Sequence, residues 1–442
     1  MSVSRRADCG LRAGVALAVL VSLAVSPSRH LAAQDSLPPE AVRVGITYTP
    51  GVRPGVVMLP GSGLDSARAI VARDLDFSDR FEIVPVLSGP GQPAPRGPRS
   101  VNYQLWRTLG AEYGVELAAD PLGVMARVHD LGGAQVRQER KFTLPALSAP
   151  DFRMAVHRMS DELVRWITGQ PGAAASRLLS VEGTRIWLVD ADGAERRPLT
   201  GATERALSPT WSPDGRRFAY TLLGEGRGPV MIQDLVTGQR AAAPGAATDL
   251  NITPSFSPDG ASLAWARSGE EGTDLFIVDL ARNCCAQRLT VGRYSDNLSP
   301  TFAPDGRRMA FVSTRPGLPQ VYAMAPDGTG QELLVPFDFG ATGPSHAPDW
   351  SPDGTNVVFH RELRGVPQLF VYDVAARRVR QLTSAGRNED PTWAPDGRHI
   401  AFVSDRSGRR QVWILDLESG RLRQLLSVGA ARLPAWSRRL AP

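Results

Sequence analysis

The sequence predicts an α/β N-terminal domain followed by an all-β six-bladed propeller, and three observations lead to this fold class. In the second half of the 442-residue chain, an aromatic residue, a small residue and Pro-Asp-Gly follow one another five times. The aromatic positions of these copies and of a sixth, incomplete copy are 43 to 48 residues apart, which is a period typical of propeller blades. The region before residue 170 instead mixes strand-like and helix-like patterns.

The repeated motif has the chemistry of a turn. Proline fixes φ at the second position of a tight turn, aspartate accepts hydrogen bonds from nearby backbone, and glycine adopts the left-handed conformation that closes it. We therefore interpret the motif residues as structural. They are Asp214, Gly215, Asp259, Gly260, Asp305, Gly306, Asp353, Gly354, Asp396 and Gly397, with Trp436 marking the incomplete sixth copy.

The number of blades follows from the strands around these turns. Each complete copy is followed by an alternating strand, a second strand and a more polar third strand. The copy at Trp436 has no strands after it, whereas residues 177–200 supply three strands with no aromatic motif before them. Pairing the last strand with this triplet gives six blades and closes the ring by strand exchange, which leaves no open sheet edge. The propeller is expected at residues 176–442.

The α/β domain is expected at residues 34–170. Gly132-Gly133 marks a hairpin turn. Gly61-Ser62-Gly63 is a weak match to a phosphate-binding loop, and an ordinary helix start capped by Asp65 or Ser66 is favoured. Strands are predicted at 42–47, 56–59, 81–86, 115–119, 124–131 and 135–144, and helices at 66–77, 102–109 and 149–168.

Residues 1–33 have the pattern of a secretory signal peptide. A basic start with Arg5 and Arg6 precedes a small and apolar run at 13–25, and we expect cleavage after Ala33. The apolar run is shorter than the roughly 20 residues that a membrane span needs. Cys9 precedes the run, so it is not a lipid-bearing cysteine. The predicted product is a secreted, soluble protein.

Charge and cysteine content exclude two classes of protein. The net charge is +5, of which the predicted signal peptide carries +3, and the remaining arginines are interleaved with acidic residues. This pattern gives no stripe for nucleic acid. Adjacent Cys284 and Cys285 form a poor disulfide, so a disulfide framework is excluded. A vicinal redox switch stays open, but two small apolar residues in a turn are favoured.

No catalytic pattern is present in the sequence. The chain has neither Gly-x-Ser-x-Gly nor His-Glu-x-x-His, and its six histidines are dispersed. His346, His360 and His399 are expected to be strand or surface residues. We therefore predict no enzyme activity, no cofactor and no metal.

The sequence resembles the TolB family over essentially the whole mature chain. The resemblance rests on the aromatic-x-Pro-Asp-Gly blades behind a signal peptide and an α/β domain. The helix and strand at 69–75 and 78–81, the Gly132-Gly133 hairpin and the closing Pro434-Ala435-Trp436-Ser437 are also similar to the family.

The resemblance implies a monomeric scaffold of the Tol-Pal system. It implies binding of the lipoprotein Pal to propeller loops and of TolA to the mature N-terminus, in support of outer-membrane integrity and constriction during division. Where family members carry histidine and threonine, this chain has Leu250 and Leu298. The Pal-type residues are Leu250, Asn251, Asn297, Leu298, Ser345, His346, Asn388, Glu389, Arg432 and Leu433, and the TolA-type residues are Gln34, Asp35, Ser36, Glu40 and Arg43.

Two alternatives stay open at this point. A propeller of this kind also suits a binding module or an enzyme that acts on a periplasmic glycan or peptide through its central pore. The second alternative is a related propeller that has been recruited elsewhere in the cell envelope.

Overall fold

The computed structural model describes residues 53–61, 63–86, 101–121, 123–282, 285–336, 343–425 and 429–441. All of them belong to one compact unit, Ile46–Pro442. The expected signal peptide, the expected strand at 42–47 and Cys284 lie outside the described residues.

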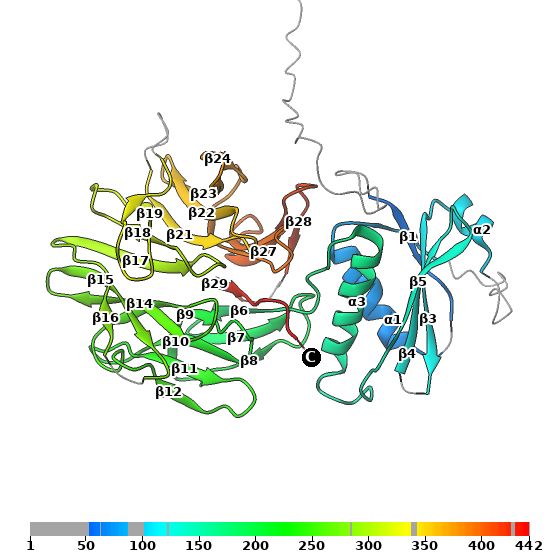
Figure 1. Cartoon of the computed structure of the whole chain (residues 1–442), viewed down its shortest axis with the longest axis horizontal. Coiled ribbons are helices and arrows are strands. Elements are labelled where there is room, and N and C mark those ends of the chain that lie inside the picture. The colour runs from blue at the N-terminus through cyan, green and yellow to red at the C-terminus, as the bar shows by residue number, and fades with distance from the viewer. Residues whose placement is uncertain are drawn as a thin grey trace, which may run out of the picture. The chain divides into compact units, whose positions relative to one another are not determined.

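The first part of the unit is a mixed sheet packed against two helices. The strand order is β2-β1-β3-β4-β5, and β1 is parallel to both of its neighbours. Helices α1 and α3 pack on each other and on one face of the sheet, where they bury an apolar core (Figure 1). The elements are β1 Gly55–Met58, α1 Asp65–Phe77, β2 Glu82–Ile83, α2 Tyr103–Thr108, β3 Tyr113–Asp120, β4 Gly123–Asp130, β5 Gln135–Phe142 and α3 Phe152–Thr168.

The start of α1 differs from the predicted capping. Leu64 occupies the N-cap position with no side-chain hydrogen bond, and Asp65 is already helical. The carboxylate of Asp65 therefore lies in the first turn, where it interacts favourably with the positive end of the helix dipole. By contrast, Asn102 caps α2, and its side chain accepts a 3.0 Å bond from the backbone N–H of Leu105.

From residue 177 on, the described elements are all β-strands. Four sheets have four strands each, in the orders β12-β11-β10-β9, β21-β22-β23-β24, β25-β26-β27-β28 and β29-β6-β7-β8. Strands β13 to β20 make two similar groups, which join into one eight-stranded sheet because β15 also pairs with β17. The first strands are β6 Arg177–Glu182, β7 Arg185–Asp190, β8 Arg197–Pro198, β9 Arg205–Trp211, β10 Arg217–Leu223, β11 Val230–Asp234, β12 Arg240–Ala242, β13 Asn251–Phe256, β14 Ser262–Gly269, β15 Gly272–Asp279 and β16 Gln287–Arg288.

The remaining strands pair antiparallel with their neighbours inside each group, whereas β15 and β17 are parallel. The last of them, β29, pairs with β6 although they are far apart in sequence, so that Trp436 lies opposite Leu178 (Figure 1). These strands are β17 Ser295–Phe302, β18 Met309–Ser313, β19 Gln320–Met324, β20 Glu332–Leu333, β21 Ser345–Trp350, β22 Asn356–Leu363, β23 Val366–Asp373, β24 Arg378–Gln381, β25 Asn388–Trp393, β26 His399–Ser404, β27 Gln411–Asp416, β28 Leu422–Gln424 and β29 Ala431–Trp436.

The Pro-Asp-Gly segments are turns between the first and second strands of a group. The five motif glycines have φ between 68° and 73°, a left-handed conformation that glycine adopts without strain. In the turn at residue 353, the Asp353 carboxylate accepts bonds from Ser351 Oγ at 2.5 Å and from the Thr355 backbone N–H at 3.0 Å. The side chain thus closes the turn from inside.

A second repeated feature is a bulge in the first strand of each group. In six strands the pairing register shifts at a residue with φ of 49° to 52° that directly precedes a proline. A left-handed non-glycine residue is uncommon, so its recurrence at equivalent positions marks a conserved geometry of the repeat. These bulge pairs are Ser208-Pro209, Thr253-Pro254, Ser299-Pro300, Ala347-Pro348, Asp390-Pro391 and Leu433-Pro434.

Candidate functional site

The first strands enclose a cavity of about 700 Å³, which we call the inner cavity. Each of β9, β13, β17, β21, β25 and β29 contributes its bulge pair to the lining. Hydroxyl groups surround the bulges, and some of them connect neighbouring strands. The Thr253 hydroxyl, for example, accepts a 3.1 Å bond from the backbone N–H of Ser299. The inner cavity is therefore shared by all six strands, with polar and apolar groups both in its lining.

Two carboxyl groups, Asp349 and Asp390, line the inner cavity, and Arg438 and Arg439 belong to the same lining. Desolvation raises the pKa of each to about 6, and for Asp390 the charge of Glu389 adds to this effect. Asp349 also accepts bonds from Thr392 Oγ1 at 3.0 Å and from the Trp393 N–H at 2.8 Å. Asp349 thus joins β21 to β25 as well as facing the cavity.

The inner cavity offers hydrogen-bonding groups and charged residues of both signs. Its described lining contains no histidine, cysteine or lysine. The arrangement can form hydrogen bonds and ion pairs of either sign.

Four of the predicted Pal-type residues are buried rather than exposed in loops. Asn251, Asn297, Ser345 and Asn388 have 0% exposure and lie in β13, β17, β21 and β25. Their side chains bond to neighbouring loops and strands, as where Asn388 Nδ2 donates to Gln368 Oε1 at 2.9 Å. The prediction of loop positions is wrong for these residues because their polar groups fix the loops from inside.

The side chains of the other predicted Pal-type residues are at least partly exposed to solvent. Leu250 is 39% exposed just before β13, and Leu298, His346, Glu389, Arg432 and Leu433 lie partly or fully exposed in the first strands. Leu298, His346, Glu389 and Arg432 each directly precede a bulge residue of the inner cavity. The structure therefore brings these accessible side chains next to the cavity lining. The TolA-type residues Gln34, Asp35, Ser36, Glu40 and Arg43 lie outside the described residues.

A buried ionic cluster that the sequence analysis missed joins the first part of the chain to the strands. His399, at the start of β26, bonds Asp396 through Nδ1 at 2.7 Å and Asp79 through Nε2 at 3.2 Å. Burial alone lowers the pKa of His399, but the charge of Asp396 and the hydrogen bonds to both carboxylates raise it to about 9. Asp396 is thus a turn residue that also holds a charged partner.

Arg398 extends this cluster. Its guanidinium bonds both carboxylate oxygens of Asp416, at 2.5 and 2.6 Å, and donates to the backbone carbonyl of Asp79 at 3.1 Å. The side chain is only 4% exposed. This fork is the strong, bidentate form of a charged hydrogen bond, and it connects β26, β27 and the end of α1.

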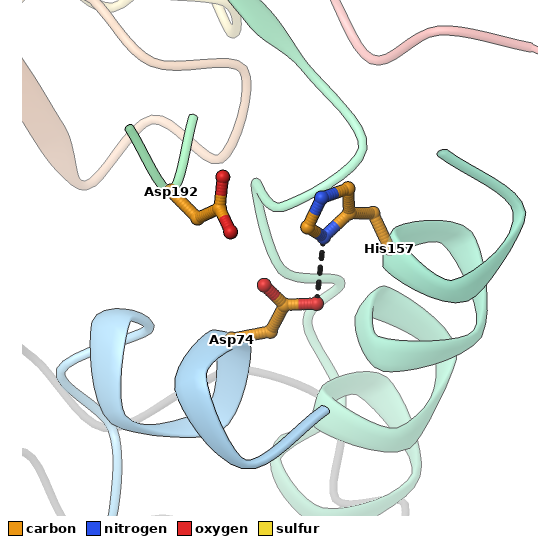
Figure 2. A group of neighbouring side chains, drawn as sticks. All are labelled: Asp74, His157 and Asp192. Atoms are coloured by element: carbon orange, nitrogen blue, oxygen red, sulfur yellow. Dashed lines mark hydrogen bonds and ion pairs between the residues drawn. The ribbon is translucent and has the colours of Figure 1, made fainter. Parts of the chain in front are cut away.

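A second buried cluster contains Asp74 from α1, His157 from α3 and Asp192 from the turn after β7 (Figure 2). His157 Nδ1 bonds Asp74 Oδ2 at 2.8 Å, and Asp192 bonds Arg153 at 2.5 Å. Burial lowers the pKa of His157, yet the bond to Asp74 and the nearby carboxylates together raise it. These side chains are all buried.

The two clusters carried a weak signal in the sequence. A polar residue such as Asp74 or His157 inside an amphipathic helix stripe indicates a buried polar group. The partner of such a group, however, is 83 residues away for Asp74 with His157, and 320 for Asp79 with His399. No local pattern specifies those pairs.

These features define a class, namely a β-propeller with an α/β segment in front of it. The model of the TolB beta propeller domain matches residues 164–338 and 339–439. The chain belongs to the TolB β-propeller family.

The curated relatives agree with this assignment. The chain is 32% identical over 198 residues to a Tol-Pal system protein TolB from Methylococcus capsulatus, covering 42% of this chain and 46% of the relative. It is 30% identical over 238 residues to a protein of the same name from Xanthomonas oryzae pv. oryzae, covering 48% and 51%. The matches thus span about half the length of these relatives.

The fold also agrees with a solved structure. A crystal structure of TolB from Acinetobacter baumannii superposes with a TM-score of 0.76 at 24% identity, covering 89% of this chain and 98% of that one. Among the helices that the structure describes, none is long and apolar enough to cross a membrane.

Proposed function

We propose that this chain is a non-catalytic periplasmic scaffold of the Tol-Pal system, which links the outer-membrane lipoprotein Pal to the inner-membrane protein TolA. The observation that supports this most directly is the family match over the propeller together with the exposed residues next to the inner cavity. The protein would act as a monomer, without cofactor, in outer-membrane integrity and constriction during division.

The proposed Pal-binding surface is the accessible set Leu250, Leu298, His346, Glu389, Arg432 and Leu433. It combines apolar side chains with a charged pair, as binding surfaces commonly do. Glu389 is held by Arg387 at 3.1 Å and by Arg410 at 3.3 Å, so its carboxylate is fixed before a partner arrives. Such fixed groups lower the ordering cost of binding. The buried Asn251, Asn297, Ser345 and Asn388 support this surface by holding its loops.

We also propose that the strands form six blades in a closed ring. The pairing of β29 with β6 supports this proposal, because it completes a four-stranded sheet from two distant segments. A closed ring presents a rigid face, which suits a scaffold. The domain division at residues 34–170 and 176–442, after a signal peptide at 1–33, is part of the same proposal.

Titration calorimetry with purified Pal and with the periplasmic domain of TolA from the same bacterium tests the proposal. Arg432→Glu and Glu389→Lys should each weaken Pal binding about tenfold, which corresponds to about 1.4 kcal/mol. The matched control is Val236→Asp. Val236 is 88% exposed in the turn after β11, and Leu235 beside it bonds Arg216 next to a Pro-Asp-Gly turn. This control should bind Pal normally.

The TolA part is tested separately by deleting residues 34–43. The deletion should abolish binding to TolA and leave Pal binding intact. If the unaltered protein binds neither partner, the scaffold proposal is wrong.

A further inference from the structure

The two buried histidines at the junction are not equivalent. Both ring nitrogens of His399 bond a carboxylate. His157 bonds Asp74 only through Nδ1, and its Nε2 has no hydrogen-bond partner. Asp74 Oδ1 is likewise buried without a partner. Buried polar atoms in proteins are nearly always paired, so the unpaired Asp74 Oδ1 indicates a missing ligand on the Asp74 side of the cluster.

The donor atoms of this cluster are close enough to share one ion. One ligand atom each from Asp74, His157 and Asp192 lies within 4.8 Å of the others. Zinc ligands bond at about 2.0–2.2 Å, so adjustments of roughly an ångström bring the three atoms around one ion. A small cavity of about 20 Å³, also lined by Asp74 and Asp192, lies beside them. A single water or ion needs roughly 10–15 Å³.

The geometry points to a binding site for one divalent metal ion of the zinc type among Asp74, His157 and Asp192, a role that does not depend on the proposed scaffold function. The ion takes the place of the proton between His157 Nδ1 and Asp74 Oδ2, and it gives Asp74 Oδ1 a partner. An imidazole with two carboxylates is a donor set that zinc accepts.

The surroundings supply the outer contacts that metal ligands need. His157 Nε2 faces Asp190 Oδ2 at 3.9 Å, where a carboxylate can orient the ring once the other nitrogen holds the ion. Arg153 bonds Asp192 at 2.5 Å and Arg177 bonds Asp190 at 3.0 Å. The arginines fix the carboxylates and offset the charge that an unoccupied cluster would carry.

The ion would connect three distant parts of the chain. Asp74 is in α1, His157 is in α3, and Asp192 follows β7. Strand β7 pairs with β6 and β8. Loading the site therefore ties the helices of the first part to the sheet that also contains β29. Removing the ion should loosen this junction first.

Metal content of the full-length mature protein, purified without a histidine tag, tests the site. The protein is stripped with a chelator, loaded with Zn²⁺ and desalted, and zinc is measured by elemental analysis beside the thermal midpoint. We expect about one equivalent of zinc and a rise of several degrees in Tm. Asp74→Asn and His157→Gln should each lose the zinc and the rise. His360→Gln, which removes the stacked pair of His346 and His360, should keep both.

Folding of the variants is checked by circular dichroism, and loading of the unaltered protein with Co²⁺ needs no variant at all. Visible Co²⁺ absorption typical of four-coordinate nitrogen and oxygen ligation is expected. The proposal is overturned if the unaltered protein retains no zinc and shows no such absorption. It is equally overturned if folded Asp74→Asn and His157→Gln retain as much zinc as the unaltered protein, because the ion then sits elsewhere.

Discussion

The repeated strands and the junction with α1 and α3 both bury polar groups, but they pair them over different distances in sequence. In the repeats, Asn388 bonds groups 2 to 20 residues away, and each motif aspartate bonds within its own turn. At the junction, His399 and Asp79 are 320 residues apart. The repeats thus contain many similar local bonds, whereas the junction depends on a few long-range charges. Loss of one junction partner should cost more than loss of one repeat bond, because it leaves a charge buried without its counter-charge.

The largest effect is expected for Arg398→Ala. This change leaves the carboxylate of Asp416 buried without its bidentate partner, which should lower the free energy of unfolding by about 3–5 kcal/mol. Arg421→Ala is the control, since Arg421 also bonds Asp79 but is 39% exposed, and it should cost less than about 1 kcal/mol. Denaturant titration measures both. Equal costs would contradict the contrast between buried and exposed partners.

The second prediction concerns pH. Because the pKa of His399 is raised to about 9 in the folded protein, its contribution is complete below the unfolded value of about 6.5 and is lost as pH rises towards 9. The loss should be on the order of 3 kcal/mol. His399→Asn should flatten this part of the profile of unfolding free energy against pH. An unchanged profile in the variant would assign the pH dependence to other groups.

A third, smaller effect is expected inside the repeats. Asn388→Leu removes the amide that bonds Gln368 and the carbonyls of Ala385 and Gly386, so it should cost about 1–3 kcal/mol. Glu389, the next residue, is half-buried. Glu389→Gln should therefore change the free energy of unfolding by less than about 0.5 kcal/mol. Chemical denaturation of the two variants side by side gives the difference. A cost for Glu389→Gln equal to that of Asn388→Leu would mean that burial is not the cause.

The fourth prediction compares the same motif position in two turns. Asp305 bonds only its own turn, through the backbone N–H of Arg307, and Asp305→Ala should cost about 1 kcal/mol or less. Asp396→Ala should cost at least twice as much, because Asp396 also holds His399. Thermal and denaturant unfolding measure the ratio. Similar values would show that the junction adds nothing to this turn.

The repeat could be predicted from the sequence because residues that are close together in the chain determine it. Pro-Asp-Gly determines each turn, and the aromatic period determines each group of strands. The bulges were missed, although each one precedes a proline such as Pro254 or Pro391, because proline restricts its predecessor without showing that φ becomes positive.

The site was predictable only in part, for a related reason. Each buried Asn or Ser is adjacent to an accessible residue such as Leu298 or Glu389. The alternation of side chains along a strand assigns the two residues to opposite faces only when the position of the bulge is known. The clusters around His157 and His399 were not predictable, since their partners meet only in the folded chain.

The pairing of β29 with β6 has a consequence for folding in time. Arg177 and Ser437, which bond at this seam, are 260 residues apart. A chain that folds from its N-terminus as it emerges leaves the edge of β6 without its neighbour until β29 has emerged. During that interval the edge is a template for wrong pairing between chains. A chaperone that covers exposed strand edges would therefore be most needed just before β29 takes its place.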